Sequence, residues 1–334
     1  MKNNPLIIVN SFKFLKYFTF LLLFAFGCAG KKKTEEKTAQ TAVHVPDFNA
    51  DSAYLYTEKQ VKFGPRIPGT SAHRQTGDFL VKKLKQFGAQ VREEKFQAVS
   101  FDGRTLDLRN IIGQFSPALS KRILLAAHWD TRPFADKDDK KPFPGANDGA
   151  SGVGVLLEAA RHFSEAPPTA GIDIVFFDGE DWGETEDANT HPPEGWDSWW
   201  CLGSQYWAKH AKQTRYAAFY AILLDMVGAP HAQFFREGES MNSAPSVVDK
   251  VWSHAHALGY ADYFVKETQA SITDDHLFIN RIAQIPAIDI VQYQPGIGYF
   301  GDYHHTQKDN MSIISKETLK AVGATVLRVV YYEK

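Results

Sequence analysis

The chain has 334 residues, of which 44% are hydrophobic and 23% are charged, and its formal net charge is −2 at pH 7. This composition is typical of a globular protein and excludes collagen-like, coiled-coil and disordered classes. A pI near 6.6 without a basic stripe argues against nucleic acid as a partner. Two cysteines are too few for a disulfide framework.

The N-terminal segment has the pattern of an export signal. Two lysines precede an apolar run over residues 17–27, which ends at Cys28. A basic region followed by roughly 7–15 apolar residues is typical of a secretory signal, whereas a membrane-spanning helix needs about 20. The small residues before Cys28 resemble a bacterial lipobox, which implies cleavage after residue 27 and lipid attachment to the Cys28 thiol. The alternative is an ordinary secretory signal with an unmodified cysteine.

This pattern divides the chain into three predicted segments. We expect residues 1–27 to be a lipoprotein signal peptide, residues 28–45 a flexible tether and residues 46–334 a single folded domain. The protein would be exported and would contact a bacterial membrane only through its lipid. Because no acidic run follows Cys28, we expect a periplasm-facing anchor. The sequence leaves the oligomeric state open.

Strands alternate with helices in the folded part. The hydrophobic pattern first predicts helices over 51–62 and 70–87 and then two strands over 89–115 that turn at Asp102-Gly103. Strands over 122–127, 172–177 and 218–224 then alternate with helices over 152–163, 203–212 and 245–258. A helix-like stretch around His276, a strand over 287–291 and a helix over 316–332 complete the chain. This alternation predicts one α/β domain with a mainly parallel sheet.

Carboxylates and imidazoles follow the predicted strands at their C-terminal ends. His128, Asp225 and the pair at 180–181 come just after apolar runs, at the sheet edge where open α/β folds bind ligands. Mixed imidazole and carboxylate donors without a usable thiol suit zinc. The full set of candidates is His128, Asp130, Asp148, Glu180, Asp181, Asp225, Asp274, Asp275, His276, His304 and His305.

Some of these residues also have a simpler structural interpretation. Asp130 shares one face of an extended segment with His128 and could orient its imidazole. Asp148 precedes a helix in a Gly-rich loop, where it could be a helix cap. Adjacent side chains diverge, so one carboxylate of the 180–181 pair can bind metal while the other transfers a proton. Cys201 is expected to be a small core residue.

Together these motifs resemble a known enzyme superfamily. The segments that carry the resemblance are 127–130, 145–148, 176–181, 224–225 and 305–306. They are similar to co-catalytic zinc aminopeptidases of the M28 superfamily, and most similar to animal-type glutaminyl-peptide cyclotransferases (glutaminyl cyclases) and their bacterial relatives. The resemblance implies a three-layer α/β/α sandwich with a mixed, mainly parallel central sheet and metal at its carboxyl edge.

The resemblance leaves two metal arrangements open. A dinuclear aminopeptidase uses five positions that are all present here, namely His128, Asp148, Asp181, Asp225 and His305. By contrast, the cyclases that this chain resembles bind one Zn²⁺ ion. The resemblance implies that its ligands here would be Asp148, Asp181 and His305. Asp274 favours the cyclases, because the peptidases commonly carry Ser at this position.

The chain departs from the animal cyclases in three respects. Asp181 stands where they have Glu, and His304 replaces a tryptophan of their pocket. Their disulfide has no counterpart here. The segment over 200–207 is nevertheless similar to that of the bacterial cyclases.

The reaction implied by the resemblance is cyclisation of the N-terminal glutamine of a peptide or protein to pyroglutamate, with release of ammonia. Zinc would polarise the γ-amide carbonyl, and Glu180 would carry a proton from the α-amine to the departing ammonia. Asp225 and Asp274 would share a proton and steady the leaving group. The residues expected in the substrate pocket are Ile272, Phe300, Trp182, Trp199, Trp200 and His304. For each tryptophan the alternative is packing in the core.

Two other functions remain open at this point. In a dinuclear aminopeptidase, Glu180 would activate a metal-bridging water that cleaves a peptide bond. A catalytically inactive binding lipoprotein would be expected to lack metal ligands, and none is missing here.

Overall fold

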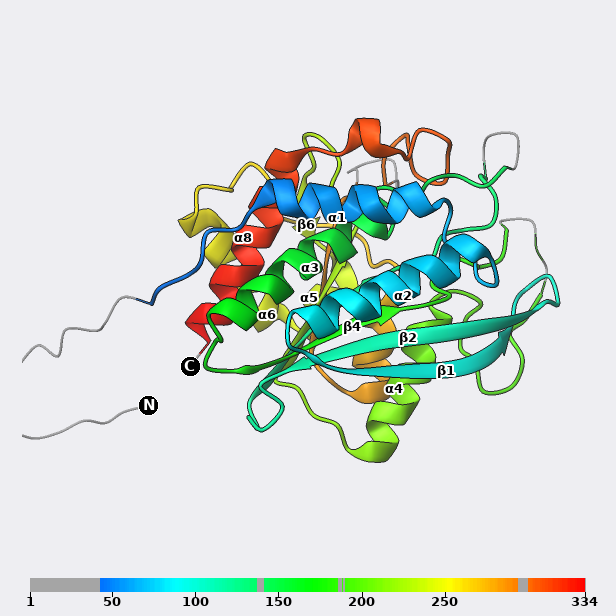
Figure 1. Cartoon of the computed structure of the whole chain (residues 1–334), viewed down its shortest axis with the longest axis horizontal. Helices are drawn as coiled ribbons and strands as arrows, with labels where there is room; N and C mark the ends of the chain where they lie inside the picture. The colour runs from blue at the N-terminus through cyan, green and yellow to red at the C-terminus, as the bar shows by residue number, and fades with distance from the viewer. Residues whose placement is uncertain (1–42, 137–140, 186–187, 189, 294–299, 334) are drawn as a thin grey trace, which may run out of the picture. The chain divides into compact units, whose positions relative to one another are not determined.

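The structure is a computed structural model that describes residues 43–136, 141–185, 188, 190–293 and 300–333 (Figure 1). Residues from Val43 onward form one compact unit. The predicted signal peptide, Cys28 and residues 28–42 of the predicted tether lie outside the described residues. Within the described ranges, no helix is both long enough and apolar enough to span a bilayer.

A six-stranded mixed sheet forms the middle layer. In spatial order its strands are β1 (Gln90–Val99), β2 (Thr105–Phe115), β4 (Gly171–Phe177), β3 (Arg122–His128), β5 (Tyr220–Asp225) and β8 (Ala287–Val291). β1 and β2 form an antiparallel hairpin that turns at the predicted Asp102-Gly103 pair, and β2 also pairs antiparallel with β4. β4, β3, β5 and β8 are parallel.

Helices cover both faces of this sheet. On one face lie α1 (Ala50–Phe63), α2 (Ser71–Gln86), α3 (Ala150–Glu165), α6 (Pro245–Ala257) and α8 (Lys316–Tyr332). On the other face lie α4 (Leu202–Thr214), α7 (Asp275–Phe278) and the π-helix Ile279–Ala283 that continues α7. Figure 1 shows α1, α2 and α3 on the opposite side of the sheet from α4. The predicted three-layer α/β/α sandwich is confirmed.

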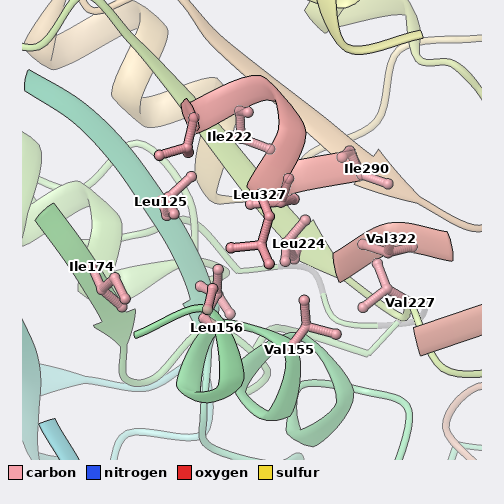
Figure 2. Close-up of a cluster of buried hydrophobic side chains, with 14 of the residues drawn as sticks. Leu125, Val155, Leu156, Ile174, Ile222, Leu224, Val227, Ile290, Val322 and Leu327 are labelled. Atoms are coloured by element: carbon pink, nitrogen blue, oxygen red, sulfur yellow. The ribbon is translucent and has the colours of Figure 1, made fainter. Parts of the chain in front are cut away.

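The parallel strands are apolar on both faces because both faces are covered. Leu125 and Ile222 point into the core with α3 and α8 (Figure 2). The neighbouring side chains, Leu124 and Leu223, pack instead with Trp207 of α4. Every residue of β3, β4, β5 and β8 is buried. The continuous apolar runs of the sequence therefore mark central strands.

The sequence pattern does not predict four short elements. β6 (Phe234–Arg236) and β7 (Phe264–Thr268) form a separate parallel pair, and α5 (Gly238–Ser243) follows β6. A 3₁₀ turn also spans Met311–Ile313. A strand of three residues contains too little periodicity to be recognised, because the period-2 pattern needs about four to eight residues.

Candidate active site and metal centre

The carboxyl ends of β3, β4 and β5 bring predicted residues to one edge of the sheet. His128 is the last residue of β3, Asp225 is the last residue of β5, and Glu180 and Asp181 lie just beyond β4. His128 Nε2 lies 3.1 Å from Asp225 Oδ1, although the two residues are 97 positions apart. The parallel strands thus produce the convergence expected at this edge.

Asp148 reaches the same edge from the loop that precedes α3. Its Oδ1 lies 3.0 Å from His128 Nε2, and its Oδ2 lies 3.5 Å from His305 Nε2. The carboxylate of Asp309 fixes the loop by accepting hydrogen bonds from two of its backbone amides. The residue that precedes α3 is Gly149, with a φ of 45° and no side-chain capping bond. Asp148 is therefore not the helix cap that was one interpretation of the sequence.

Asp130 fixes the turn that carries Glu180 and Asp181. Its carboxylate oxygens accept hydrogen bonds from the amides of Glu180 at 3.1 Å and Asp181 at 3.2 Å. The distance from its Oδ1 to His128 Nδ1 is 3.6 Å, beyond a hydrogen bond. Asp130 therefore mainly holds the turn that carries Glu180 and Asp181, whereas the sequence suggested that it orients the imidazole of His128.

His305 presents its Nε2 atom to two aspartates. Its Nδ1 forms a 2.6 Å hydrogen bond with Asp136 Oδ2, and its Nε2 lies 3.1 Å from Asp181 Oδ1. The ring also stacks with Trp200, at 6.0 Å between centroids. An imidazole that is held by a carboxylate through one nitrogen is typical of a zinc ligand that binds through the other.

Asp148, Asp181 and His305 fit a zinc ion by their chemistry. Two carboxylates and one imidazole leave the fourth position of a tetrahedral site open. Asp181 Oδ1 is buried and has no aligned hydrogen-bond donor within the described residues, so a lone pair of this oxygen is available to a cation. His304 is a further candidate ligand, because its donor atom lies within 4.8 Å of those of Asp148 and His305.

Three residues at this edge have unfavourable backbone conformations. Cys201, Met226 and His305 have left-handed φ angles of 59°, 48° and 54°. Met226 directly follows Asp225, and the Cys201 thiol contacts Glu180. Residues with side chains adopt such angles at a cost, and they collect at functional sites. The local backbone therefore supports the assignment of this edge as the site.

A cavity of about 680 Å³ opens onto these groups. The predicted residues in its described lining are Asp148, Glu180, Asp181, Trp200, Asp225, Ile272, Asp274, Phe300, His304 and His305. His128 is absent from that lining, because it is 1% exposed and contacts Asp148 and Asp225. The volume is suited to a ligand of a few residues.

Two of the predicted pocket tryptophans lie elsewhere. Trp182 is 3% exposed and packs with Leu108 and Leu202 in a separate hydrophobic cluster. Trp199 is 6% exposed and is also absent from the described lining. Side chains of an irregular segment diverge, so closeness in sequence to the acidic pair does not bring a ring to the cavity. The expectation that Trp182 and Trp199 wall the pocket is therefore wrong in this structure.

Buried polar residues hold the segment that carries Asp274 in place. Donor atoms of Asp274, His276 and Asp289 lie within 4.8 Å of one another. His276 Nε2 lies 3.0 Å from Glu237 Oε2, and Glu237 Oε1 accepts a 2.9 Å hydrogen bond from the Ile272 amide. Glu237 therefore ties the segment that carries Ile272 and Asp274 to the start of α5.

Burial, together with neighbouring charges, shifts the pKa values of the groups at this site. Burial raises the pKa of Glu180 well above its usual range, although the nearby His128 opposes this shift. Burial also raises the pKa of Asp225 to about 7. Burial lowers the pKa of His305, but Asp181 and other carboxylates raise it to about 10. The protein thus retains protons where a divalent cation would balance the negative charge.

Comparison with known proteins places the chain in a family. The sequence pattern of peptidase family M28 matches residues 110–330. The chain belongs to peptidase family M28. The solved structure of a Zn-dependent exopeptidase from Parabacteroides distasonis has 50% sequence identity to this chain and a TM-score of 0.83. The comparison covers 87% of this chain and 100% of that chain.

Two further relatives of this chain are named as glutaminyl cyclases or cyclotransferases. The structure of Bacteroides thetaiotaomicron glutaminyl cyclase bound to N-acetylhistamine has 49% identity and a TM-score of 0.83, over 87% of this chain and 100% of the other. A glutaminyl-peptide cyclotransferase of the snake Boiga irregularis is 26% identical, over 78% of this chain and 74% of the relative. The suspected M28 and cyclase resemblance is confirmed.

Sequence reasoning missed several residues that hold the M28 site in place. Asp136, Asp309 and Glu237 act on candidate ligands or pocket segments through hydrogen bonds. None of the three belongs to a recognisable metal-binding motif, so only tertiary contact reveals their roles. Of the three, Asp309 could have been considered from the sequence, because it closely follows the 305–306 motif.

We predict that Asp130→Ala destabilises the fold and weakens zinc binding. The substitution leaves the amides of Glu180 and Asp181 buried without an acceptor, at a cost of about 3 kcal/mol for two bonds to a charged group. Loss of support behind a ligand should also lower zinc affinity by about 10- to 100-fold. Denaturant unfolding and zinc titration measure the two effects.

Asp107→Ala is the matched control for this prediction. Asp107 is exposed on β2 and accepts a hydrogen bond from Gln97, so its removal should change stability by about 0.5 kcal/mol or less. Equal stability and zinc affinity of the Asp130→Ala and Asp107→Ala variants would contradict the assigned role of Asp130.

Proposed function

We propose that the chain is a zinc-dependent glutaminyl-peptide cyclotransferase, which converts the N-terminal glutamine of peptides or proteins to pyroglutamate and releases ammonia. The observation that carries this proposal is the placement of Glu180, Asp225 and Asp274 around one cavity beside Asp148, Asp181 and His305. Cyclase-named relatives of up to 49% identity support it. Asp274 also supports it, because peptidases of this superfamily commonly carry Ser there.

We assign one zinc ion to Asp148, Asp181 and His305. When bound, zinc supplies a Lewis acid that polarises a carbonyl oxygen and stabilises negative charge on it. His128 Nε2 lies 3.1 Å from Asp225 Oδ1, and His305 Nε2 lies at the same distance from Asp181 Oδ1. The choice of a single ion rests on the resemblance to the cyclases.

Glu180 is the proposed proton carrier. Its carboxyl group faces the cavity, and a pKa raised by burial suits a group that both takes and returns a proton. It would remove a proton from the α-amine, which attacks the γ-amide carbon, and deliver that proton to the departing nitrogen. The nucleophile and electrophile belong to one residue, so the protein mainly supplies orientation.

The other cavity residues would hold the glutamine in its cyclising conformation. Asp225 and Asp274 both line the cavity, and in this proposal they share a proton and bind the leaving nitrogen. Ile272 and Phe300 supply apolar surface, and the His304 and Trp200 rings each stack on His305. Such a wall would exclude water, whose attack on the same carbonyl would give glutamate instead of pyroglutamate.

A dinuclear aminopeptidase is the second candidate function. The observation that favours it is the group formed by His128, Asp148 and Asp225, whose donor atoms lie within 4.8 Å of one another. With Asp181 and His305 this group completes the five positions of a two-zinc site. The relative named as a Zn-dependent exopeptidase also supports it.

Products from a peptide with N-terminal glutamine distinguish the two reactions. We predict ammonia and a peptide of unchanged residue count, since cyclisation breaks only the side-chain amide bond. Mass spectrometry and an ammonia assay measure this outcome. Glu180→Gln should lower kcat by at least about 100-fold and leave the zinc content unchanged. Release of free amino acids by the wild-type protein would establish proteolysis instead.

We predict one zinc ion per chain, bound through His305 and not through His304. His305→Ala should lose most of its zinc, because His305 Nε2 lies 3.1 Å from Asp181 Oδ1 and 3.5 Å from Asp148 Oδ2. His304→Ala should retain the ion, because the proposed ligand set does not include His304. Elemental analysis after dialysis gives the stoichiometry, and the thermal unfolding midpoint should fall when a chelator removes the ion. Two tightly bound ions would favour the aminopeptidase.

We further propose that the chain is an exported lipoprotein with Cys28 as its lipidated residue and a periplasm-facing domain from residue 46. The support is the signal-like sequence before Cys28. Cells fed an alkyne-labelled fatty acid should label the wild-type chain but not the Cys28→Ser variant, and added protease should degrade the domain only after the outer membrane is opened. A wild-type chain without label would contradict lipidation.

A further inference from the structure

The buried thiol of Cys201 contacts the proposed proton carrier. Cys201 Sγ lies 3.1 Å from Glu180 Oε1, and within the described residues this thiol is the one hydrogen-bond donor recorded on the Glu180 carboxyl group. We propose that Cys201 is a positioning residue, whose S–H group holds Glu180 in the orientation that proton transfer requires. The proposal rests on the proposed cyclase function.

The backbone places this thiol at Glu180 through two more bonds. The Cys201 amide donates to the Glu180 carbonyl at 3.0 Å, and the Leu202 amide donates to the Gly179 carbonyl at 3.0 Å. Cys201 is also the residue that precedes α4, but its side chain makes no capping bond there. The thiol therefore points toward Glu180 instead of toward its own helix.

The conformation of Cys201 indicates that this placement is under constraint. Its φ of 59° and ψ of 37° are left-handed, a region that is unfavourable for residues other than glycine. Glycine would remove this strain but would also remove the side chain. The chain thus keeps a strained residue at the position from which a side chain reaches Glu180.

The carboxylate neighbours of Glu180 repel it, while the imidazole of His128 attracts it from a distance beyond a hydrogen bond. Donor atoms of Glu180, Cys201 and Asp274 lie within 4.8 Å of one another, and the carboxylates of Asp181 and Asp275 also act on Glu180. Repulsion alone would leave the carboxyl group free to adopt several rotamers. A donor on Oε1 selects one rotamer and leaves Oε2, 3.9 Å from His128 Nδ1, to accept the substrate proton.

The thiol is suited to act as a donor. Cys201 is fully buried beside Leu277 and Phe278. Burial and the adjacent carboxylates raise the pKa of the Cys201 thiol well above its usual range, so the sulfur keeps its proton. A protonated thiol can donate to a carboxylate but is a poor metal ligand, which separates this role from that of Asp148, Asp181 and His305.

Two substitutions separate the hydrogen bond from simple packing. Cys201→Ser keeps a donor, Cys201→Ala does not, and both are smaller than cysteine without being β-branched. We expect Cys201→Ala to lower kcat for cyclisation by about 5- to 10-fold, as loss of one modest hydrogen bond would, with KM changed by less than about twofold. Cys201→Ser should remain within about twofold of the wild-type kcat. Equal losses in both variants, or no loss in either, would overturn the proposal.

A second measurement does not depend on activity. The infrared difference spectrum between the wild-type chain and Cys201→Ala isolates the S–H stretching band of Cys201, since the other cysteine is common to both proteins. In the wild-type chain, the hydrogen bond to Glu180 should lower the frequency of this band below that of a free thiol. In Glu180→Gln the frequency should rise toward the free-thiol value, because a neutral amide is a weaker acceptor. An unchanged band would show that the thiol does not bind Glu180. If the wild-type chain releases no ammonia while the band shifts as expected, the proposed function fails and the contact stands.

Discussion

The site depends on holding several carboxylates together at one end of a sheet. The side chains of Asp148, Asp181 and Asp225 belong to residues that are only 3%, 1% and 6% exposed, so solvent screens their mutual repulsion poorly. The protein opposes this repulsion mainly with fixed donors, such as the Arg132 amide on Asp181 and the imidazole of His128 on Asp148 and Asp225. A divalent cation beside Asp148 and Asp181 would balance the remaining charge.

Packing inside the sandwich sets the spacing of these groups. The Asp148 loop leads directly into α3, and Asp225 ends β5, so the distance between helix and strand fixes the distance between the carboxylates. α3 approaches closely because Gly152 has no side chain: a Cβ at this position would lie 2.3 Å from the Leu224 carbonyl oxygen. Core packing on one face of the sheet therefore determines the geometry of the proposed metal site.

The sequence predicts those parts of the molecule whose cause is local. Buried parallel strands appear as apolar runs, and the polar residues that end them stand out, which is why His128, Asp225 and the 180–181 pair could be identified. Residues that act across the fold leave no such mark: Asp309 and Glu237 hold segments that are far away in the sequence. Trp182 illustrates the opposite error, because it adjoins the acidic pair in sequence but packs into a separate hydrophobic cluster.

Asp274 connects the scaffold shared by the M28 family to the choice between two reactions. Burial is the main reason that the pKa of Asp225 rises to about 7, and the negative charge of Asp274 adds to the shift while His128 opposes it. A carboxyl group that retains its proton is a poor metal ligand but a good hydrogen-bond donor to a nitrogen that is leaving. A serine at position 274 would carry no charge and would leave Asp225 more acidic and freer to bind a second ion. We therefore propose that Asp274, which is not one of the three assigned zinc ligands, favours a one-metal cyclase over a two-metal peptidase at this edge of the sheet.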